Sequence, residues 1–377
     1  MSLRHYAFVI FVGALVTFIS TPLVRSFALR RGLVDTPGGR KVHTAPIPRL
    51  GGVAIFLGVA AGVATQMVGE RYLHWGGMLV DPTGQLPMRI VGTIVALVVI
   101  FLVGLVDDLF TLTPGVKFAG QVVAACIAVA AGLRIDYIGN PFGGGLVALG
   151  LLSIPVTLVY ILGFTNVINL IDGLDGLAAG VSAIAATGLL ILAAQGNRLD
   201  AAALAAAVIG ACVAFLRYNF HPASIFMGDS GALFLGFALA TISLLGVMKS
   251  TAAIALAVPL LIIGVPIFDT ASAIIRRVRH QRPIQEADRG HIHHRLLGRG
   301  FDQRQTVLII YVWCVLLGFG AYAVRWAPPT AKVLAFVLLF AVTGFMTYWL
   351  GLFEAVGHSE DDHGRGSSKG VRRTASK

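Results

Sequence analysis

The stretch Gly163-Phe-Thr-Asn-Val-Ile-Asn-Leu-Ile-Asp-Gly-Leu-Asp-Gly176 places two amides and two carboxylates inside an otherwise apolar sequence. Asn166, Asn169, Asp172 and Asp175 recur every three residues, a spacing that keeps neighbouring side chains on roughly one side of a helical turn. Several oxygen ligands could therefore converge at one point. The alternative is a polar loop between two membrane helices, but such a loop has no reason to hold carboxylates among isoleucines and leucines. The pattern favours a functional site.

The apolar character extends over the whole chain. Of its 377 residues, 56% are hydrophobic and only 12% are charged, whereas about 25% of a soluble globular domain is charged. These values exclude an ordinary soluble protein and predict an all-α, polytopic integral membrane protein. The formal charge of +11 would suggest a nucleic-acid partner in a soluble protein, but here the basic residues fall in loops between apolar runs. We therefore expect no nucleic-acid partner.

Eleven segments are apolar enough to cross a hydrocarbon core about 30 Å thick. They run from about 5–28, 50–69, 88–106, 116–132, 147–164, 176–194, 200–217, 230–248, 252–275, 305–324 and 331–353. The first is too long for a signal peptide and is expected to be retained. The ninth contains Pro259 and Pro266, so we expect a kinked or broken helix. Residues 1–353 are expected to form one membrane domain and residues 354–377 a disordered cytosolic tail.

The loops alternate between two sides, and one side carries 21 of the 29 lysines and arginines. By the positive-inside rule this side is cytosolic and the N-terminus lies outside. The unusual carboxylates fall on the same side, so they could form a single site. Cys126, Cys212 and Cys314 lie in apolar runs and are expected to be small buried side chains rather than disulfide or zinc ligands.

Adjacent carboxylates end the third predicted span. Asp107 and Asp108 should repel each other unless a cation lies close to them. An acidic pair exposed to water at a helix end is the alternative, and the apolar neighbours of the pair speak against it. Lys117 begins the next span on the same side and could contact a phosphate, although a lone lysine at this position is often only an interfacial anchor.

Another carboxylate, Asp229, lies in the segment Phe226-Met-Gly-Asp-Ser-Gly231, at the start of the eighth predicted span. Asp229 could be a simple helix N-cap. That role does not account for Phe226, whose ring could stack on a planar base.

Two basic loops lie on the same side as these acids. The first holds Lys41, His43 and Arg49 beside Pro46 and Pro48; it could set topology or clamp an anion. The second contains the cluster His291-Ile-His-His-Arg295, in which arginines surround His291, His293 and His294. A structural zinc site would need cysteines that are absent nearby, so phosphate binding or proton handling is the better interpretation.

Carboxylates that can hold a divalent cation, together with Arg and Lys that can hold phosphates, are what phosphoryl transfer requires. At these five separated motifs the sequence resembles the polyprenyl-phosphate N-acetylhexosamine-1-phosphate transferases, over about 35–295. The His-x-His-His form and the Asp35-Thr-Pro opening look more like the GlcNAc-1-phosphate branch than the phospho-MurNAc-pentapeptide branch, which remains an alternative.

The resemblance implies that a UDP-N-acetylhexosamine and undecaprenyl phosphate react to give UMP and an undecaprenyl-diphosphate sugar at the cytosolic face of the bacterial inner membrane. It implies Mg²⁺, or alternatively Mn²⁺, and allows a homodimer. The metal ligands implied are Asp229 and Asn169. The catalytic residues implied are Asp107, Asp108, Asp172, His291, His293 and His294. The substrate-binding residues implied are Lys41, His43, Arg49, Lys117, Asn166, Asp175, Phe226 and Arg295, with Asp175 on the uracil edge and Phe226 stacked on the base.

Two other functions are alternatives that the residues disfavour. A lipid-linked sugar transporter or flippase should carry ionisable residues near the middle of its spans, whereas the acids here lie at one edge. A CDP-alcohol phosphatidyltransferase should show Asp-Gly-x-x-Ala-Arg, and Asp175-Gly-Leu-Ala-Ala-Gly180 lacks the arginine.

Overall fold

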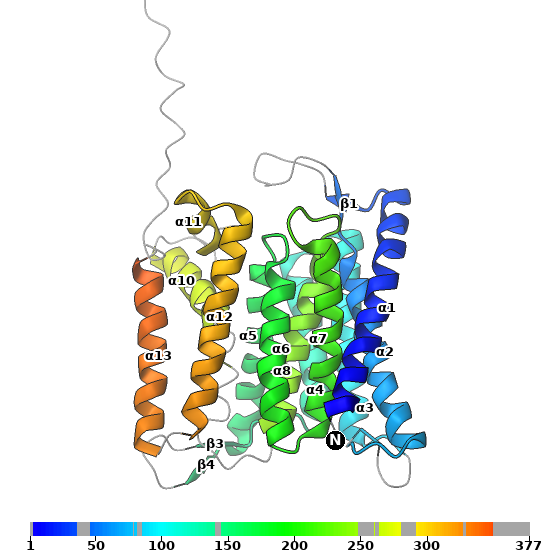
Figure 1. Ribbon diagram of the computed structural model, residues 1–377. Helices are drawn as coiled ribbons and strands as arrows, with labels where there is room; N and C mark the ends of the chain where they lie inside the picture. Colours follow the sequence, from blue (N-terminus) through cyan, green and yellow to red (C-terminus); the bar gives the residue numbers. More distant parts are fainter. Residues whose placement is uncertain are drawn as a thin grey trace, which may run out of the picture.

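The computed structural model of the chain describes residues 3–35, 46–77, 79–80, 85–139, 145–247, 260, 264–279, 292–326 and 329–349. These residues form an all-helical bundle with two small hairpins (Figure 1). The helices are α1 Leu3–Arg30, α2 Gly51–Tyr72, α3 Met88–Phe110, α4 Pro114–Ala130, α5 Ser153–Ile171, α6 Leu177–Gln195, α7 Leu199–Asn219, α8 Gly228–Val247, α10 Gly264–Arg279, α11 Ile292–Gly298, α12 Gln303–Trp326 and α13 Pro329–Trp349.

The predicted membrane bundle is confirmed. Within the described ranges, eight helices are long and apolar enough to cross a membrane: α1, α2, α3, α5, α6, α7, α8 and α12. Helix α4 and the apolar part of α13 are shorter. Each of the eleven predicted segments overlaps one of the helices α1–α8, α10, α12 and α13.

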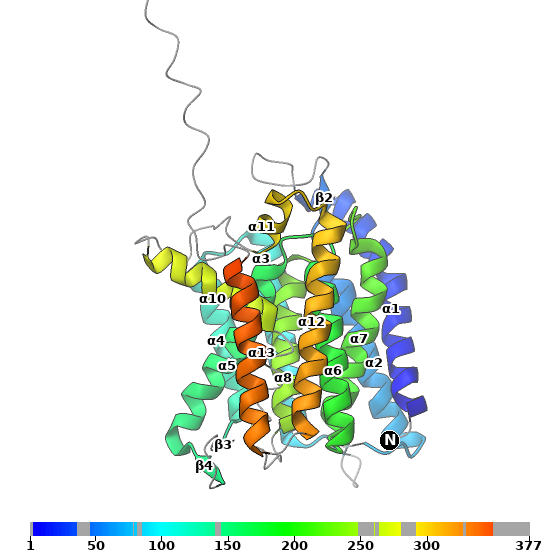
Figure 2. The ribbon, with the colours of Figure 1, turned by 60° about the vertical axis from the view of Figure 1, so that its left-hand side comes forward.

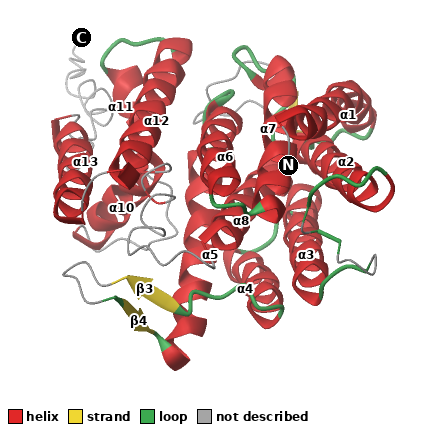
Figure 3. Cartoon of the chain, turned by 60° about the horizontal axis from the view of Figure 1, so that its bottom comes forward, coloured by secondary structure: helices red, strands yellow, loops and turns green. Residues whose placement is uncertain are grey.

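The centre of the bundle is α8. Helices α2, α3, α5, α6 and α7 all pack against it, and Figure 3 shows it among them, while α10, α12 and α13 stand to one side. Close packing is possible because glycines bring backbones together. A Cβ on Gly104 of α3 would come within 2.5 Å of the Asp229 carbonyl oxygen, and one on Gly52 of α2 within 2.1 Å of the Gly231 nitrogen. The N-terminal turns of α8 are thereby held against α2 and α3.

The hairpins lie at opposite ends of the bundle. Strands β1 (Val34–Asp35) and β2 (Ile47–Pro48) pair antiparallel near the start of α2, and β3 (Tyr137–Gly139) and β4 (Leu146–Ala148) pair antiparallel before α5. Figure 1 places β1 and α11 at one end and β3, β4 and the N-terminus at the other. The described elements β1 and α11, which border two of the loops predicted to share one side, therefore share one end.

Two predicted details were wrong. The fifth span was placed at 147–164, but α5 continues to Ile171, so Asn166 and Asn169 lie in its last turns and not in a loop. The apolar run through Ile168 and Ile171, both buried, explains why the helix continues. Cys126 is exposed on α4, whereas Cys212 and Cys314 are buried as expected.

The ninth predicted segment is only partly covered. Pro259 and the tail 354–377 lie outside the described residues, so a break at Pro259 and the nature of the tail stay predictions. The second half of the segment forms α10, with Pro266 in its first turn, where a missing N–H costs no helical hydrogen bond. Helix α10 runs obliquely to α12 and α13 (Figure 2).

Replacing Gly104 should separate α3 from α8. We expect Gly104→Ala to lower the free energy of unfolding by about 1–3 kcal/mol, because the new methyl group overlaps the backbone of Asp229 and Ser230. The matched control is Gly163→Ala, since no atom lies within 4 Å of a Cβ there and alanine favours a helix. Thermal unfolding in detergent compares the two, and equal stability of both variants would contradict this packing.

Candidate active site

A buried ion cluster joins the ends of four helices. The Nζ atom of Lys117, in the first turn of α4, lies 3.0 Å from Asp107 Oδ2 at the end of α3 and 2.5 Å from Asp229 Oδ1 at the start of α8. It also lies 3.4 Å from Asn169 Oδ1 on α5. The side chain of Lys117 is 19% exposed and that of Asp229 33%, so the cluster is reachable from solution.

The two adjacent carboxylates have different surroundings. Asp107 Oδ1 accepts the Leu112 N–H at 2.7 Å, and its other oxygen faces Lys117. Asp108 Oδ1 accepts the Asp229 N–H at 2.8 Å, and Oδ2 accepts the Ser230 N–H at 3.0 Å and the Ser230 hydroxyl at 2.6 Å. Asp108 therefore caps α8 from another helix. The N-cap role considered for Asp229 belongs to Asp108, and the Asp229 carboxylate is left to face Lys117.

The turn before α8 packs closely against the start of α2. Gly228 has φ +73°, and a Cβ there would lie 2.5 Å from the Arg49 carbonyl oxygen and 2.6 Å from Asp108 Oδ2, so only glycine fits this position. The N–H groups of Gly51 and Gly52 donate to the carbonyl oxygens of Phe226 and Met227 at 2.9 and 2.7 Å. Arg49 and Phe226, which are far apart in sequence, are thus held on adjoining strands of backbone beside the cluster.

Asn169 contributes the second hydrogen bond to Asp229. Its Nδ2 donates to Asp229 Oδ1 at 2.5 Å, so the two predicted metal ligands contact each other. Asn166 lies one turn earlier and donates from Nδ2 to Gln121 Oε1 at 2.7 Å. Asn166 therefore ties α5 to α4 and orients the helix that carries Asn169.

Asp172 follows the end of α5 and is half-buried. Its carboxylate has no hydrogen-bond or ion-pair partner within the described ranges. Burial, followed by repulsion from the carboxylates of Asp229, Asp108 and Asp175, raises the pKa of Asp172 to about 8. A partly buried carboxyl group beside three others is the part of the cluster that would gain most from an added cation.

Asp175 holds a neighbouring turn. Its Oδ2 atom lies 2.8 Å from His221 Nδ1 and accepts the Ala223 N–H at 3.0 Å. Arg304 at the start of α12 donates from Nε to the His221 carbonyl oxygen at 3.1 Å. Phe226 lies three residues beyond Ala223. Asp175 is therefore hydrogen-bonded to the same short loop that carries Phe226, the other residue predicted to bind a base.

The structure describes only part of the two basic loops. Lys41 and His43 of the first loop and His291 of the second lie outside the described residues. His293 and His294 are in α11, and Arg295, on the same helix, is half-buried. The first residue of α11, Ile292, donates its N–H to Oδ1 of the buried Asp269 at 2.7 Å, so α10 anchors the helix that carries these residues.

The sequence did not single out Gln121, His221 or Ser230. Each touches a predicted residue: Gln121 contacts Asn166, His221 contacts Asp175, and Ser230 contacts Asp108. Their only signal was position, since His221 and Ser230 flank Phe226 and Asp229 in the same segment, and Gln121 follows Lys117 by one helical turn.

The described residues contain no group of three or more His, Cys, Asp and Glu side chains arranged to hold a metal. The cluster nevertheless offers carboxylate and amide oxygens, which suit Mg²⁺, and a site for this ion uses one or two carboxylates together with substrate phosphates. Asp229 and the unpartnered Asp172 fit that requirement.

Comparisons with known proteins agree on one family. The family model described as glycosyl transferase family 4 matches residues 90–247. A Bacillus subtilis (strain 168) protein named a probable undecaprenyl-phosphate N-acetylglucosaminyl 1-phosphate transferase is 42% identical over 308 residues, covering 82% of this chain and 80% of the relative.

More distant relatives match over similar lengths. A decaprenyl-phosphate N-acetylglucosaminephosphotransferase of Mycolicibacterium smegmatis is 35% identical over 90% of this chain and 87% of its own. An undecaprenyl-phosphate alpha-N-acetylglucosaminyl 1-phosphate transferase of Yersinia pestis is 28% identical, with 86% of both chains covered. The family match at residues 90–247 includes α4, α5, α8 and nearly all of α3, the helices that carry the ion cluster.

Removing the Asp108 cap should destabilise the protein. In Asp108→Ala the N–H groups of Asp229 and Ser230 and the Ser230 hydroxyl lose their acceptor in a buried place, and we expect a loss of about 3 kcal/mol or more in unfolding free energy. Asp107→Ala is the control, because Lys117 keeps Asp229 as a partner. Denaturant unfolding in micelles measures both, and an Asp108→Ala protein as stable as Asp107→Ala would rule out the capping role.

Proposed function

This chain belongs to glycosyl transferase family 4, and we propose on that premise that it transfers GlcNAc-1-phosphate from UDP-GlcNAc to undecaprenyl phosphate and releases UMP. The relatives from Bacillus subtilis and Yersinia pestis are named for the same sugar phosphate and acceptor. A helical bundle that spans the membrane suits an acceptor that stays in the bilayer while the donor arrives from solution.

The observation that carries the proposal is the position of Lys117. Its ammonium group is the cationic partner of Asp107 and Asp229 at the end of the bundle, where an apolar acceptor chain and a water-soluble donor can both reach it. A phosphate oxygen can exchange for one of the carboxylates as a partner of this lysine. Lys117 can therefore bind phosphate while Asp107 keeps its orientation.

The transfer needs little help with protons. A phosphate monoester has its second pKa near 6, so at neutral pH the acceptor is largely a dianion. One of its oxygens forms a bond to the β-phosphorus of the donor, and the bond from that phosphorus to the oxygen bridging to the α-phosphate breaks, so that UMP leaves. Asp107 and Lys117 orient the phosphate and balance its charge, and no base is required of Asp108, which caps α8.

We also propose Mg²⁺ as the cofactor, with Asp229 and Asp172 as its protein ligands and Asn169 holding Asp229 in place. When bound, the ion neutralises charge on the diphosphate as its bond breaks. The uracil base would lie at the turn that joins Asp175 to Phe226, where Asp175 keeps one oxygen beyond its bonds to His221 and Ala223.

The basic loops support a cytosolic site in the inner membrane. Strand β1 and helix α11, which border these loops in the sequence, lie at one end of the bundle (Figure 1), and β2 is joined to the turn before α8 by the bond from the Phe226 N–H to the Pro48 carbonyl oxygen. Lysine and arginine in short loops face the cytosol. UDP-sugars are made in the cytosol, so the donor would reach the cluster directly.

A reconstituted assay tests the function. Purified protein with Mg²⁺, UDP-GlcNAc and undecaprenyl phosphate should release UMP and form a lipid-linked sugar, with no UMP released when the lipid is omitted. Competition by other UDP-N-acetylhexosamines tests the choice of sugar. Absence of lipid-dependent UMP release would refute the proposal.

Neutralising the ion cluster should stop the reaction without unfolding the protein. We expect Lys117→Met and Asp229→Asn each to lower kcat/KM for UMP release at least a hundredfold, because each removes a charge that holds phosphate or cation. The control is Arg134→Gln, at the far end of the bundle, where, among the described residues, the side chain donates to the Val129 carbonyl oxygen alone. Unchanged activity in Lys117→Met would overturn the assignment of the phosphate contact.

Cation binding should release a proton near neutral pH. Because the pKa of Asp172 is raised to about 8, most of this group is protonated at pH 7, and Mg²⁺ binds the deprotonated form. Mg²⁺ affinity should therefore increase from pH 6 to about pH 8 and then level off. Calorimetry in buffers of different ionisation enthalpy measures the proton, and Asp172→Asn should abolish its release. A pH-independent affinity would exclude Asp172 as a ligand.

A further inference from the structure

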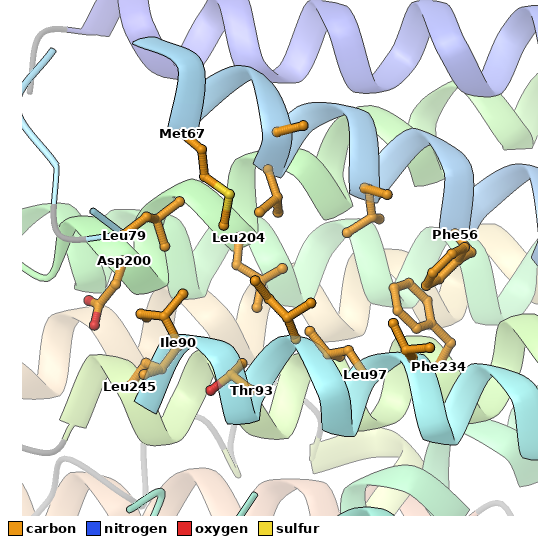
Figure 4. A pocket seen from close by; sticks show the side chains of 16 residues that line it. Phe56, Met67, Leu79, Ile90, Thr93, Leu97, Asp200, Leu204, Phe234 and Leu245 are labelled. Atoms are coloured by element: carbon orange, nitrogen blue, oxygen red, sulfur yellow. The ribbon is translucent and has the colours of Figure 1, made fainter. Parts of the chain in front are cut away.

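A slot lies between α2 and α3, and its α3 wall, Ile90 to Val98, belongs to the half of that helix that is far from the ion cluster. Its volume is about 240 Å³, well above the 150 Å³ or so that holds a benzene molecule in a protein. Figure 4 shows Met67, Leu79 and Asp200 at one end and Phe56 and Phe234 at the other. The slot is long, and aliphatic side chains make up most of its walls.

The slot is an open groove at the surface of the bundle. Helices α2 and α3 have few contacts with each other and both pack on α8, so the groove lies between them. Ala60 and Ala64, one turn apart on α2, line it and are exposed. Val68 on α2 and Val95 on α3 do not line it but are 52% and 44% exposed, as expected of side chains that face lipid. A hydrocarbon chain can therefore enter from the side.

Basic side chains gather at the far end of the slot. Asp200, which lines it, is fully buried and accepts from Arg89 Nη2 at 2.8 Å and from Arg198 Nη2 at 3.2 Å. Two guanidinium groups thus share one carboxylate. The Nε and Nη1 atoms of Arg198 are buried without a hydrogen-bond partner, and Arg89 is 28% exposed.

A further acid at this end is already bonded to backbone. Glu70 at the end of α2 accepts the N–H groups of Leu79 and Val80 at 3.0 and 2.9 Å, and Arg71 follows it in the sequence. Among these described residues, the arginines Arg71, Arg89 and Arg198 stand against the two carboxylates of Glu70 and Asp200, and Arg89 is partly exposed.

The height of Arg89 in the membrane matches a lipid headgroup. Nineteen residues separate it from Asp108 on α3, which corresponds to roughly 28 Å at 1.5 Å per residue. A hydrocarbon core is about 30 Å thick. If Asp108 lies at one interface, Arg89 lies at the other.

We propose that this slot binds an anionic phospholipid of the surrounding membrane, with one acyl chain between α2 and α3 and its phosphate on Arg89. Charge complementarity selects an acidic headgroup, and the apolar walls select a hydrocarbon chain. The acceptor's phosphate cannot lie on Arg89 during transfer, because it must reach Lys117 at the opposite end of α3. The proposal depends only on the membrane location of the chain and is independent of the proposed function.

Native mass spectrometry of the purified protein in detergent tests the site. With phosphatidylglycerol and phosphatidylcholine of identical acyl chains, we expect phosphatidylglycerol to bind at least fivefold more tightly. Arg89→Gln should remove this preference, while Arg134→Gln, which changes the same charge at the same end of the bundle, should keep it. Ala64→Phe should reduce binding of both lipids, and Val68→Phe, one turn further along α2, should not.

A measurement on the unmodified protein guards against a variant that does not fold. Phosphatidylglycerol carrying a photoreactive acyl chain should label peptides of α2 and α3 that contain Met67 or Thr93. Equal binding of the two lipids, a preference that survives Arg89→Gln, or labelling confined to other helices would each overturn the proposal. So would displacement of the bound lipid by undecaprenyl phosphate, or a change from dimer to monomer in Ala64→Phe, which would assign the slot to the acceptor or to a second copy of the chain.

Discussion

The contact on which the site depends is the capping of α8 by Asp108. The N-terminus of a helix has N–H groups without intrahelical partners. The first turn of α8 is surrounded by other helices and its Ser230 is buried, so water cannot satisfy all of these groups. Asp108 does so from α3, with three hydrogen bonds to Asp229 and Ser230. Since Gly104 allows the two backbones to touch one turn below, α3 and α8 are fixed in position and angle. That fixed junction places the Asp229 carboxylate beside Lys117.

The junction of α3 and α8 brings together charges that do not cancel. Two carboxylates, Asp107 and Asp229, share one ammonium group, so the pair carries a net negative charge that an added cation can complete. Asp172 adds a third carboxyl group, whose pKa is raised first by burial and then by the neighbouring carboxylates. Phosphate groups of the two substrates would repel this cluster without a cation. If Mg²⁺ is the cofactor, as proposed, binding of the metal would therefore be coupled to binding of the substrates.

Much of this could be predicted from the sequence, and the exceptions have physical causes. Apolar runs of membrane length gave the bundle, and the loop charges gave the end at which the site lies. The division of labour between Asp107 and Asp108 could not be predicted, because adjacent side chains on a helix point about 100° apart and only packing decides which one meets α8. The bonds from Asn166 to Gln121 and from Asp175 to His221 likewise join segments 45 and 46 residues apart, a distance that no local pattern encodes.

Helix α3 gives the two ends of the molecule different chemistry. Its apolar stretch is about as long as the hydrocarbon core is thick, so the residues that flank the stretch, Arg89 and Asp107, must each lie at an interface. At one interface an arginine shares a buried carboxylate with Arg198, and at the other a carboxylate shares a lysine with Asp229. A lipid phosphate would be attracted to the arginines directly, but it would approach the carboxylates only where Lys117 and the proposed metal ion offset their charge. Under the two proposals, the same ligand group would be bound without a cofactor at one interface and only with one at the interface where transfer takes place.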